Sequence, residues 1–367
     1  MQGGGATAIF AGTDDLVLHG CLSGAGTAWH WSPALGCDAV SKAVLRCEII
    51  GDPAQFDALT PHWWKLWQQS PSATPFQSPA WLVPWWHAFA PGELATVAVW
   101  RGGDLVGLAP CYLEHGTAGS KLLPVGISLS DYLDILAVPG IEAEVVGVIA
   151  ESIFSIGWAQ WILSDLPQDS VALAMKHPEM DRPTAHAACP VLAIAGDETL
   201  AGCVPARRRR QLRRARQAAS RCGRIALSSA SGSPQTFLDQ LIRLHNVRWA
   251  EHGGGVLANP AVEQFHRLSL PLLDAHGLVR CWLLAIDDRT IGAYYGFYHR
   301  GRAYAYLGGF DPAYAEESPG AILIGHAIVE SIREDAREFD FLRGQEAYKY
   351  GWGAADRWTM RRVWTRS

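Results

Sequence analysis

Two stretches of the chain alternate apolar and turn-forming residues in the same way. Residues 95–115 (ATVAVWRGGDLVGLAPCYLEH) give an apolar run, a Gly-Gly-Asp turn and a second apolar run, which is the pattern of a β-hairpin. Residues 279–299 (VRCWLLAIDDRTIGAYYGFYH) repeat this pattern around an Asp-Asp-Arg turn. In both, the second strand begins with a β-branched residue followed by glycine, at Val106 and at Ile291, an offset of 185 residues. The sequence therefore predicts one structural unit that occurs twice.

The elements that follow the two hairpins also match. Each hairpin is followed by a predicted strand, a Pro-Gly pair that opens a helix, and a further strand. These elements are expected at 132–138, 139–140 and 161–166 in the first half, and at 303–310, 319–320 and 339–344 in the second. The predicted fold class is α/β (α+β), with two tandem domains, each a mixed, mostly antiparallel sheet flanked by helices.

Helices are also predicted before each hairpin. In the first half, Ser78 as N-cap and Pro79 at the first helical position begin a helix rich in aromatic residues. In the second half, apolar residues at helical spacing predict two amphipathic helices, one with Phe237, Leu241 and Leu244 and the other with Val262, Phe265, Leu268 and Leu272. Most of the 16 tryptophans are expected in the core.

Composition sets the broad class of the protein. The chain has 367 residues, of which 49% are hydrophobic, and this leaves room for two domains. The formal charge of -5 and the pI of about 6.2 argue against general nucleic-acid binding. Apolar stretches end well short of the roughly 18 to 20 residues of a spanning helix, so no transmembrane segment is expected. Eight cysteines without CxxC spacing indicate reduced thiols in a cytoplasm and no metal site.

Composition also suggests the domain boundaries. Residues 1–42 are rich in Gly and Ala and carry no Lys or Arg before Lys42, so we expect a disordered extension or a mis-assigned start. An N-terminal domain is expected at 43–196, and a basic linker helix with its connection at 197–233. A C-terminal domain carrying the active site is expected at 234–367.

The C-terminal half contains a dense group of ionisable residues. The stretch 339–352 (FDFLRGQEAYKYGW) begins like a buried strand and then places acidic, basic and phenolic side chains within ten residues. Burial penalises such groups unless they are paired. Ionisable groups collected at a strand end are typical of a functional site, and the alternative is a salt-bridged strand end without a function.

The order of a strand, two helices, three antiparallel strands, a helix and a strand resembles the GNAT acyltransferase fold, and two copies resemble the Fem peptidyltransferases. The motifs TPFQSPAWL, RRRRQLRRARQ, GFDPAYAEESPGAIL and FDFLRGQEAYKYGW are similar to a GNAT branch associated with cellulose and exopolysaccharide synthesis, CelD-like with a BioF2-like acetyltransferase domain. The resemblance covers roughly residues 45–360. It implies transfer of an acyl group from a thioester, acyl-CoA or acetyl-CoA, to an amine or hydroxyl of a small molecule or of a glycan or envelope precursor, without a metal.

The segment ESPGAIL has the features of an anion site. Ser318 can cap a helix that begins at the following proline, and the free N–H groups and dipole of such a helix suit a pyrophosphate. Gly320 lets a ligand approach the backbone closely. We therefore predict that Ser318, Gly320 and Ala321 bind the cofactor, and the alternative is an ordinary capped helix. The common GNAT loop has Gln or Arg and Gly or Ala where this chain has Glu317 and Ile322.

Acyl transfer requires a base for the nucleophile, a donor for the tetrahedral oxyanion and a proton for the leaving thiolate. In the stretch 339–352, Asp340 could accept the proton, Tyr348 could protonate the sulfur and Lys349 could stabilise the oxyanion. The alternative is that Asp340 and Lys349 pair with each other while the aromatic residues pack. The predicted substrate-binding residues are Asp311, Arg343 and Trp352.

The stretch 207–216 contains seven arginines in ten positions and predicts a basic helix. Such a helix is often a solvated face. The functional alternative is contact with a polyanion, namely the 3′-phosphate of CoA, a polysaccharide, a lipid headgroup or, as in the Fem relatives, tRNA. The residues that would make this contact are Arg207, Arg208, Arg209 and Arg210. Two alternatives thus stand beside the acyl-CoA-dependent enzyme: an aminoacyl-tRNA-dependent Fem-like transferase and a non-catalytic ligand-binding module.

Overall fold

The structure is a computed structural model that describes residues 44–175, 182–194, 199–250 and 255–366. The described residues belong to one compact unit, Ala43–Ser367. The extension predicted at residues 1–42 lies outside the described residues.

The elements of the first half follow the predicted order of a strand, helices, a hairpin, a helix and a strand. They are β1 (Leu45–Ile50), α1 (Pro53–Ala58), α2 (Thr60–Gln69), α3 (Pro79–Phe89), β2 (Glu93–Leu94), β3 (Thr96–Arg101), β4 (Asp104–Ala109), β5 (Cys111–Glu114), β6 (Lys121–Pro124), β7 (Leu136–Ala137), α4 (Glu142–Ser155) and β8 (Gln160–Leu166).

The second half is preceded by β9 and by the basic helix, and its elements again follow the predicted order. They are β9 (Thr184–Ala193), α5 (Leu200–Cys203), α6 (Ala206–Cys222), β10 (Ile225–Ser229), α7 (Pro234–Trp249), α8 (Pro260–Ala275), β11 (Val279–Ile286), β12 (Arg289–His299), β13 (Arg302–Phe310), α9 (Pro319–Arg333), β14 (Glu338–Asp340), α10 (Ala347–Tyr350) and β15 (Ala355–Thr365).

The described strands form two sheets, one with the order β1-β3-β4-β7 and one with the order β10-β11-β12-β13-β14-β9-β15-β8-β6-β5-β2. The longer sheet passes through both halves, because β9 pairs with β14 and the C-terminal strand β15 pairs with both β8 and β9. Most of the pairs are antiparallel, and β13–β14 and β6–β8 are parallel. Each half therefore depends on a strand from the other for its sheet.

The strands β13 and β14 stay together for only a short distance. Their parallel pairing runs from Arg302 opposite Glu338 to Tyr304 opposite Asp340. Beyond this point β14 ends, while β13 continues to Phe310. The edge of β13 after Tyr304 therefore faces no strand in the described part of the chain.

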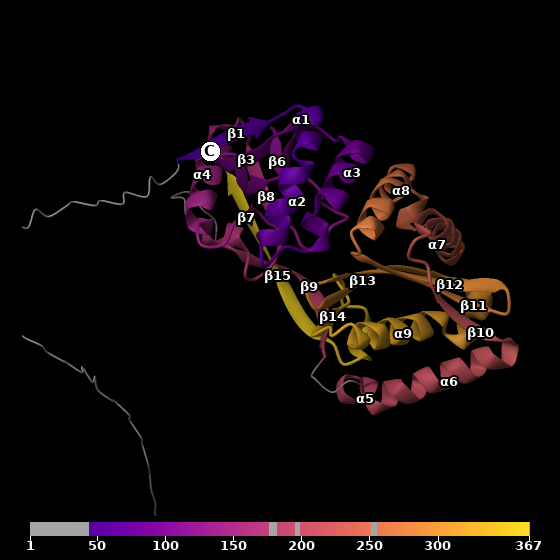
Figure 1. The fold of residues 1–367 in the computed structure, drawn as a ribbon. Coiled ribbons are helices and arrows are strands. Elements are labelled where there is room, and N and C mark those ends of the chain that lie inside the picture. Colours follow the sequence, from indigo (N-terminus) through magenta and orange to yellow (C-terminus); the bar gives the residue numbers. More distant parts are fainter. Residues whose placement is uncertain (1–43, 176–181, 195–198, 251–254, 367) are drawn as a thin grey trace, which may run out of the picture. The chain divides into compact units, whose positions relative to one another are not determined.

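Helices cover both faces of the second half of this sheet (Figure 1). The helices α7 and α8 lie on one face, and α9 and α6 lie on the other. Phe237, Leu241 and Leu244 of α7 are fully buried, as predicted, and each contributes roughly 1.5 to 3 kcal/mol to stability. A glycine permits the close approach of α7, since a Cβ at Gly309 would lie 2.7 Å from the backbone nitrogen of His245.

The mixed α/β class with mostly antiparallel sheets is confirmed, as are both hairpins and the strand at 303–310. Three local predictions are wrong. The strand expected at 132–138 is reduced to β7, and β14 ends at Asp340 because Leu342 takes a positive φ of 59° that breaks the strand. In α8, Leu268 and Leu272 were expected on the buried face, but they are 41% and 46% exposed. The residues buried in their place are His266, Leu270 and Leu273.

Candidate active site

A cavity opens where β13 separates from β14, and we call it the β13–β14 cavity. Its volume is about 330 Å³. One wall is the unpaired end of β13, and the opposite wall is the first half of α9. The residues that line it are Arg208, Arg248, Ala293, Tyr294, Gly320, Ala321, Leu323, Ile324, Tyr348 and those at 305–310.

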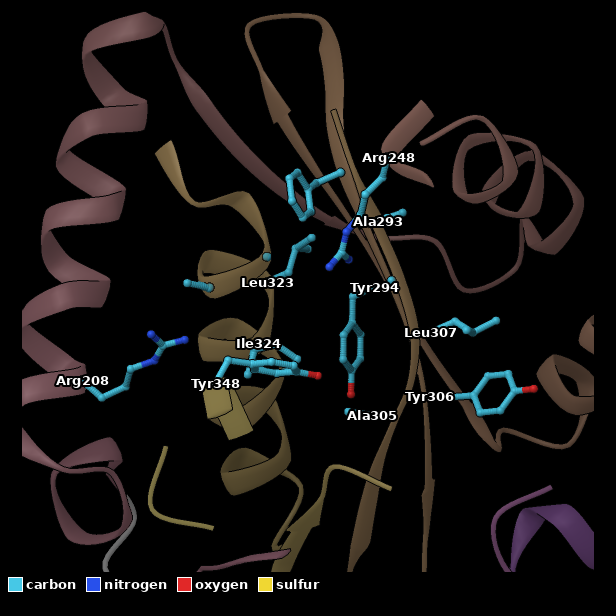
Figure 2. A pocket seen from close by; sticks show the side chains of 15 residues that line it. Arg208, Arg248, Ala293, Tyr294, Ala305, Tyr306, Leu307, Leu323, Ile324 and Tyr348 are labelled. Carbon is cyan, nitrogen blue, oxygen red and sulfur yellow. The ribbon is translucent and has the colours of Figure 1, made fainter. Parts of the chain in front are cut away.

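Two arginines bring positive charge to this otherwise apolar cavity. Figure 2 shows Arg208 reaching in from α6 and Arg248 from the end of α7, with the rings of Tyr294 and Tyr348 between them. The guanidinium of Arg248 lies 4.5 Å from the ring centre of Phe310. Burial lowers the pKa of both arginines from its ordinary value, yet arginine remains charged in proteins. The cavity therefore suits an anionic ligand with an apolar portion.

The N-terminus of α9 contributes backbone to the cavity, but the predicted serine cap is wrong. Ser318 occupies the N-cap position with φ 53° and ψ 55°, and its side chain makes no capping hydrogen bond. Its carbonyl instead accepts from the N–H groups of Ala321 and Ile322 at 2.9 and 3.2 Å. Gly320 and Ala321 line the cavity, and a Cβ on Gly320 would meet only Phe310, at 3.9 Å. Two of the three predicted cofactor-binding residues thus lie at the cavity.

Tyr348 is the predicted proton donor, and its ring lines the β13–β14 cavity. Its side chain is half-exposed and follows the N-cap residue Glu346 at the start of the short helix α10. Desolvation raises the pKa of Tyr348 to about 12; Glu346 adds to the rise and Arg248 opposes it. The hydroxyl is therefore protonated at neutral pH and can donate.

Asp340 lies at the last β13–β14 pair, outside the lining of this cavity, and is fully buried. Its Oδ2 accepts a hydrogen bond from the Tyr132 hydroxyl at 2.6 Å, and its Oδ1 accepts from the Leu342 N–H at 2.7 Å. Desolvation raises the pKa of Asp340 to about 6, against the opposing effects of these two donors and of Arg357. A carboxyl group that titrates there can exchange a proton near neutral pH.

Lys349 does not face the β13–β14 cavity. Its Nζ donates to the carbonyls of Leu342, Arg343 and Gly344 at 3.0, 2.7 and 3.1 Å, and it pairs with Glu346 at 2.9 Å. The side chain is 3% exposed. All its protons are therefore engaged in holding the turn after β14, which corrects the prediction of an oxyanion donor. The alternative of an Asp340–Lys349 pair is wrong too, because each has other partners.

Arg343, one of the predicted substrate-binding residues, is held within the protein. Its Nε donates to Asp131 at 2.8 Å and its Nη1 to Asp165 at 3.1 Å, so it joins the turn after β14 to the first half. Its Nη2 donates to the Ser128 carbonyl at 3.1 Å. These three contacts occupy the guanidinium of Arg343. The predicted contact between Arg343 and a substrate is therefore not supported.

The other two predicted substrate-binding residues, Asp311 and Trp352, also have partners within the protein. Asp311 caps the 3₁₀ helix Pro312–Glu317 through the Ala313 N–H, 3.0 Å away, and pairs with Arg289 at 2.6 Å. Trp352 is fully buried under the guanidinium of Arg208, which lies 4.3 Å from its ring centre. Neither residue offers a free surface to a substrate.

Sequence reasoning missed Arg248 and Tyr294. Arg248 ends α7, and Tyr294 lies on β12, where its hydroxyl donates to the Tyr304 carbonyl at 3.4 Å. Arg248 comes 100 positions before Tyr348 in the chain, so no local motif connects them. A basic residue in the last turn of a predicted amphipathic helix was the one available signal, and it is also typical of helix C-termini.

Two negative findings concern the described residues alone. Among residues 44–175, 182–194, 199–250 and 255–366, no three His, Cys, Asp or Glu side chains come together in a way that could hold a metal ion. Within the same part of the chain, none of the helices has the length and apolar character needed to cross a membrane.

Comparison with known proteins shows which family and which structures this chain is similar to. Residues 206–350 match the family model described as an acetyltransferase (GNAT) domain. No curated protein matches the sequence. The structure is similar to that of FemX, with 12% identity, a TM-score of 0.60, and coverage of 88% of this chain and 97% of FemX.

Two further structures share the fold. L-PGS from Bacillus licheniformis has 11% identity and a TM-score of 0.55, over 86% of this chain and 93% of that one. The C-terminal domain of a putative lysylphosphatidylglycerol synthetase from Agrobacterium fabrum has 11% identity and a TM-score of 0.54, over 86% and 92% of the two chains. Residues 206–350 are therefore similar to the acetyltransferase (GNAT) domain family, within a chain that has the fold of FemX.

Proposed function

We propose that the protein transfers an acyl group from a thioester donor, acyl-CoA, bound in the β13–β14 cavity, to an amine or hydroxyl acceptor. The observation that carries the proposal is the position of this cavity. It combines an unpaired strand edge, the N-terminus of α9 and two arginines within residues 206–350, the range of the GNAT match. The acceptor that we propose is a small molecule or a precursor of a glycan or of the cell envelope.

The residues of the cavity fit such a donor in three respects. The free edge of β13 offers backbone N–H and C=O groups to an extended amide-containing arm, as an added strand would use them. Arg208 and Arg248 can hold phosphate groups through charge-assisted hydrogen bonds. Leu323 and Ile324 supply an apolar wall for the acyl chain. The exposed carboxylate of Glu316 beside the helix start is the feature that fits least well.

The chain supplies two groups for proton transfer. We assign Tyr348 as the donor that protonates the leaving sulfur, because its hydroxyl is protonated at neutral pH and its ring lines the cavity. We assign Asp340 as the final acceptor of the proton that the nucleophile loses. The described cysteines Cys47, Cys111, Cys189, Cys203, Cys222 and Cys281 are free thiols, which supports a cytoplasmic setting for the reaction.

The test is thiol release from acetyl-CoA in the presence of a mixture of primary amines, followed with a thiol reagent. Arg248→Gln should raise the KM for acetyl-CoA by about 10-fold or more, since a charge-assisted hydrogen bond is lost. Arg243→Gln, on the same helix but outside the cavity, serves as the matched control. No thiol release by the wild-type protein with any acyl-CoA would refute the proposal.

A second candidate function uses aminoacyl-tRNA as the donor. One observation favours it: α6 places Arg208 in the cavity and also presents Arg207, Arg210, Arg213 and Arg214 to solvent. A polyanion on this face could extend into the β13–β14 cavity. The second candidate predicts tRNA binding that weakens steeply with salt, and it fails if tRNA does not compete with acetyl-CoA.

A further inference from the structure

A second cavity, which we call the polar cavity, lies beside the last β13–β14 pair. Its volume is about 250 Å³. Tyr304 and Asp340, which form that pair, belong to its wall, and the lining of the β13–β14 cavity begins at the next residue, Ala305. The two cavities therefore flank the same point of the sheet. The polar cavity is lined by Thr74, Tyr132, Pro167, Gln168, Asp169, Arg302, Tyr304, Asp340 and Arg357.

The polar cavity contains a coupled phenol and carboxyl group. The Tyr132 hydroxyl donates to Asp340 Oδ2 at 2.6 Å, and Asp340 itself is fully buried. Both residues line the cavity, and the hydroxyl shares its proton with the carboxyl group. Burial, the negative charge of Asp340 and that hydrogen bond all raise the pKa of Tyr132. The phenol therefore keeps a proton at neutral pH, so it can pass a proton on only while it receives another.

Both signs of charge border the polar cavity. Arg302 and Arg357 share one carboxylate, Glu338, at 3.0 and 2.6 Å, and Arg357 also lies 3.8 Å from Asp340 Oδ2, so two positive charges face two carboxylates. Asp169, which is exposed, also lines the cavity and adds a further carboxylate. Such a cavity is complementary to a small molecule that carries an anionic group and an ammonium group together.

We propose that the polar cavity binds the acceptor, a small zwitterionic primary amine such as an amino acid or the amino-acid end of a peptide, and that the Tyr132 hydroxyl passes its proton to Asp340. This inference rests on the proposed function. The anionic group of the acceptor pairs with Arg302, since both Nη atoms of Arg357 already donate to Glu338 at 2.9 and 2.6 Å, and the acceptor nitrogen is directed at Tyr132.

The proton transfers balance as follows. The acceptor ammonium gives a proton to the Tyr132 oxygen while the Tyr132 hydroxyl proton moves to Asp340 Oδ2, which leaves a neutral amine and a neutral carboxyl group. The amine nitrogen forms a bond to the acyl carbon and the C–S bond breaks, with Tyr348 protonating the sulfur. The second proton lost by the nitrogen returns to Tyr348. Asp340 then releases its proton to solvent.

The charged and titratable groups around Asp340 come from every neighbouring element. They are Tyr132 before β7, Cys189 on β9, Arg302 and Tyr304 on β13, Glu338 on β14 and Arg357 on β15. Because Asp340 must be ionised to accept a proton, activity should fall as the pH drops through the pKa of Asp340 near 6. Asp340→Asn should remove this fall in activity at low pH. The amide oxygen of the new side chain can still accept the hydrogen bond from the Leu342 N–H.

Binding is measured first, by saturation-transfer NMR with L-lysine and ethylamine as probes. L-lysine should bind and ethylamine should not, because only the former carries a carboxylate. Gln168→Trp, at the exposed rim, should abolish the L-lysine signal, whereas Gln217→Trp on the exposed face of α6 should not change it. No L-lysine signal with the wild-type protein, or a signal that survives Gln168→Trp, would overturn the proposal even if acetyl-CoA is used as a donor.

Kinetics then test the relay. Asp340→Asn and Tyr132→Phe should each lower turnover by about 100-fold, and the double variant should be no slower than either single one, since both remove the same step. Tyr304→Phe, a neighbouring phenol of the same wall, should act additively with Asp340→Asn. Additive effects of Tyr132→Phe and Asp340→Asn would exclude the relay. Full activity of both variants, with thiol release intact, would refute this inference and the role of Asp340, and would leave acyl transfer from acyl-CoA in the β13–β14 cavity standing.

Discussion

Replacing Arg343 with Met should destabilise the protein more than any exposed ion pair could. The substitution leaves Asp131 and Asp165, whose side chains are 9% and 2% exposed, without their shared cation. Removing one partner of a buried ion pair costs about 3 to 5 kcal/mol. For a folded unit of roughly 325 residues, each kcal/mol corresponds to about 1.5 °C, so the melting temperature should fall by about 4 to 8 °C.

The effect should depend on pH in a definite direction. Desolvation raises the pKa of Asp165, and Arg343 opposes the rise. Without Arg343 the pKa rises further, so the ionised carboxylate destabilises the folded state above that pKa and protonation relieves the cost below it. Arg343→Met should therefore cost more at pH 8 than at pH 5.

The assay is thermal and denaturant unfolding at both pH values, with Arg333→Met as the control. Arg333 pairs with Glu330 at 2.6 Å, but its side chain is 68% exposed, so its loss should cost no more than about 1 kcal/mol. Equal melting temperatures for the two variants at pH 8, or a cost of Arg343→Met that does not change with pH, would refute the proposed role of the cluster.

Three further predictions concern the predicted site. Lys349→Met should lower the melting temperature by several degrees, because three carbonyls lose a shared donor, while affinity for acetyl-CoA measured by calorimetry stays within about 3-fold. Tyr348→Phe should lower thiol release by about 100-fold with unchanged melting, and a wild-type rate would exclude it as the proton donor. Replacing Arg207 and Arg210, both exposed, with Gln should weaken retention on heparin without a change in melting, and unchanged retention would reduce the run to a solvated face.

The repeated hairpins and the helix after each Pro-Gly pair could be predicted from the sequence, because alternation and turn residues act locally. The junction of the halves could not. Strand β15 pairs with β8 and β9, whose paired residues lie 164 to 205 positions earlier in the chain, and no local pattern encodes that pairing. The break after Asp340 could not be predicted either, because the turn that follows, with its positive φ at Leu342, is held by hydrogen bonds from Lys349 to three of its carbonyls.

Part of the candidate site could also be predicted, because some of its residues lie in local motifs. Gly320, Ala321 and Tyr348 line the β13–β14 cavity, and they lie in the two motifs with the clearest chemistry. The roles given to Lys349 and Arg343 failed because a charged side chain in a motif can serve either a ligand or its own fold. Only three-dimensional partners such as Asp131 distinguish the two cases.

Binding of acetyl-CoA to a variant with a filled cavity tests the central claim most directly. Gly320 has no positive φ and lies in the wall, so Gly320→Phe should fill the β13–β14 cavity without backbone strain, whereas Gly320→Ala should be tolerated, with its Cβ 3.9 Å from Phe310. By calorimetry, acetyl-CoA should bind the wild-type protein and Gly320→Ala alike and should not bind Gly320→Phe, with melting temperatures within a few degrees. Undiminished binding to Gly320→Phe, or none to the wild-type protein, would contradict the assignment of this cavity to the donor.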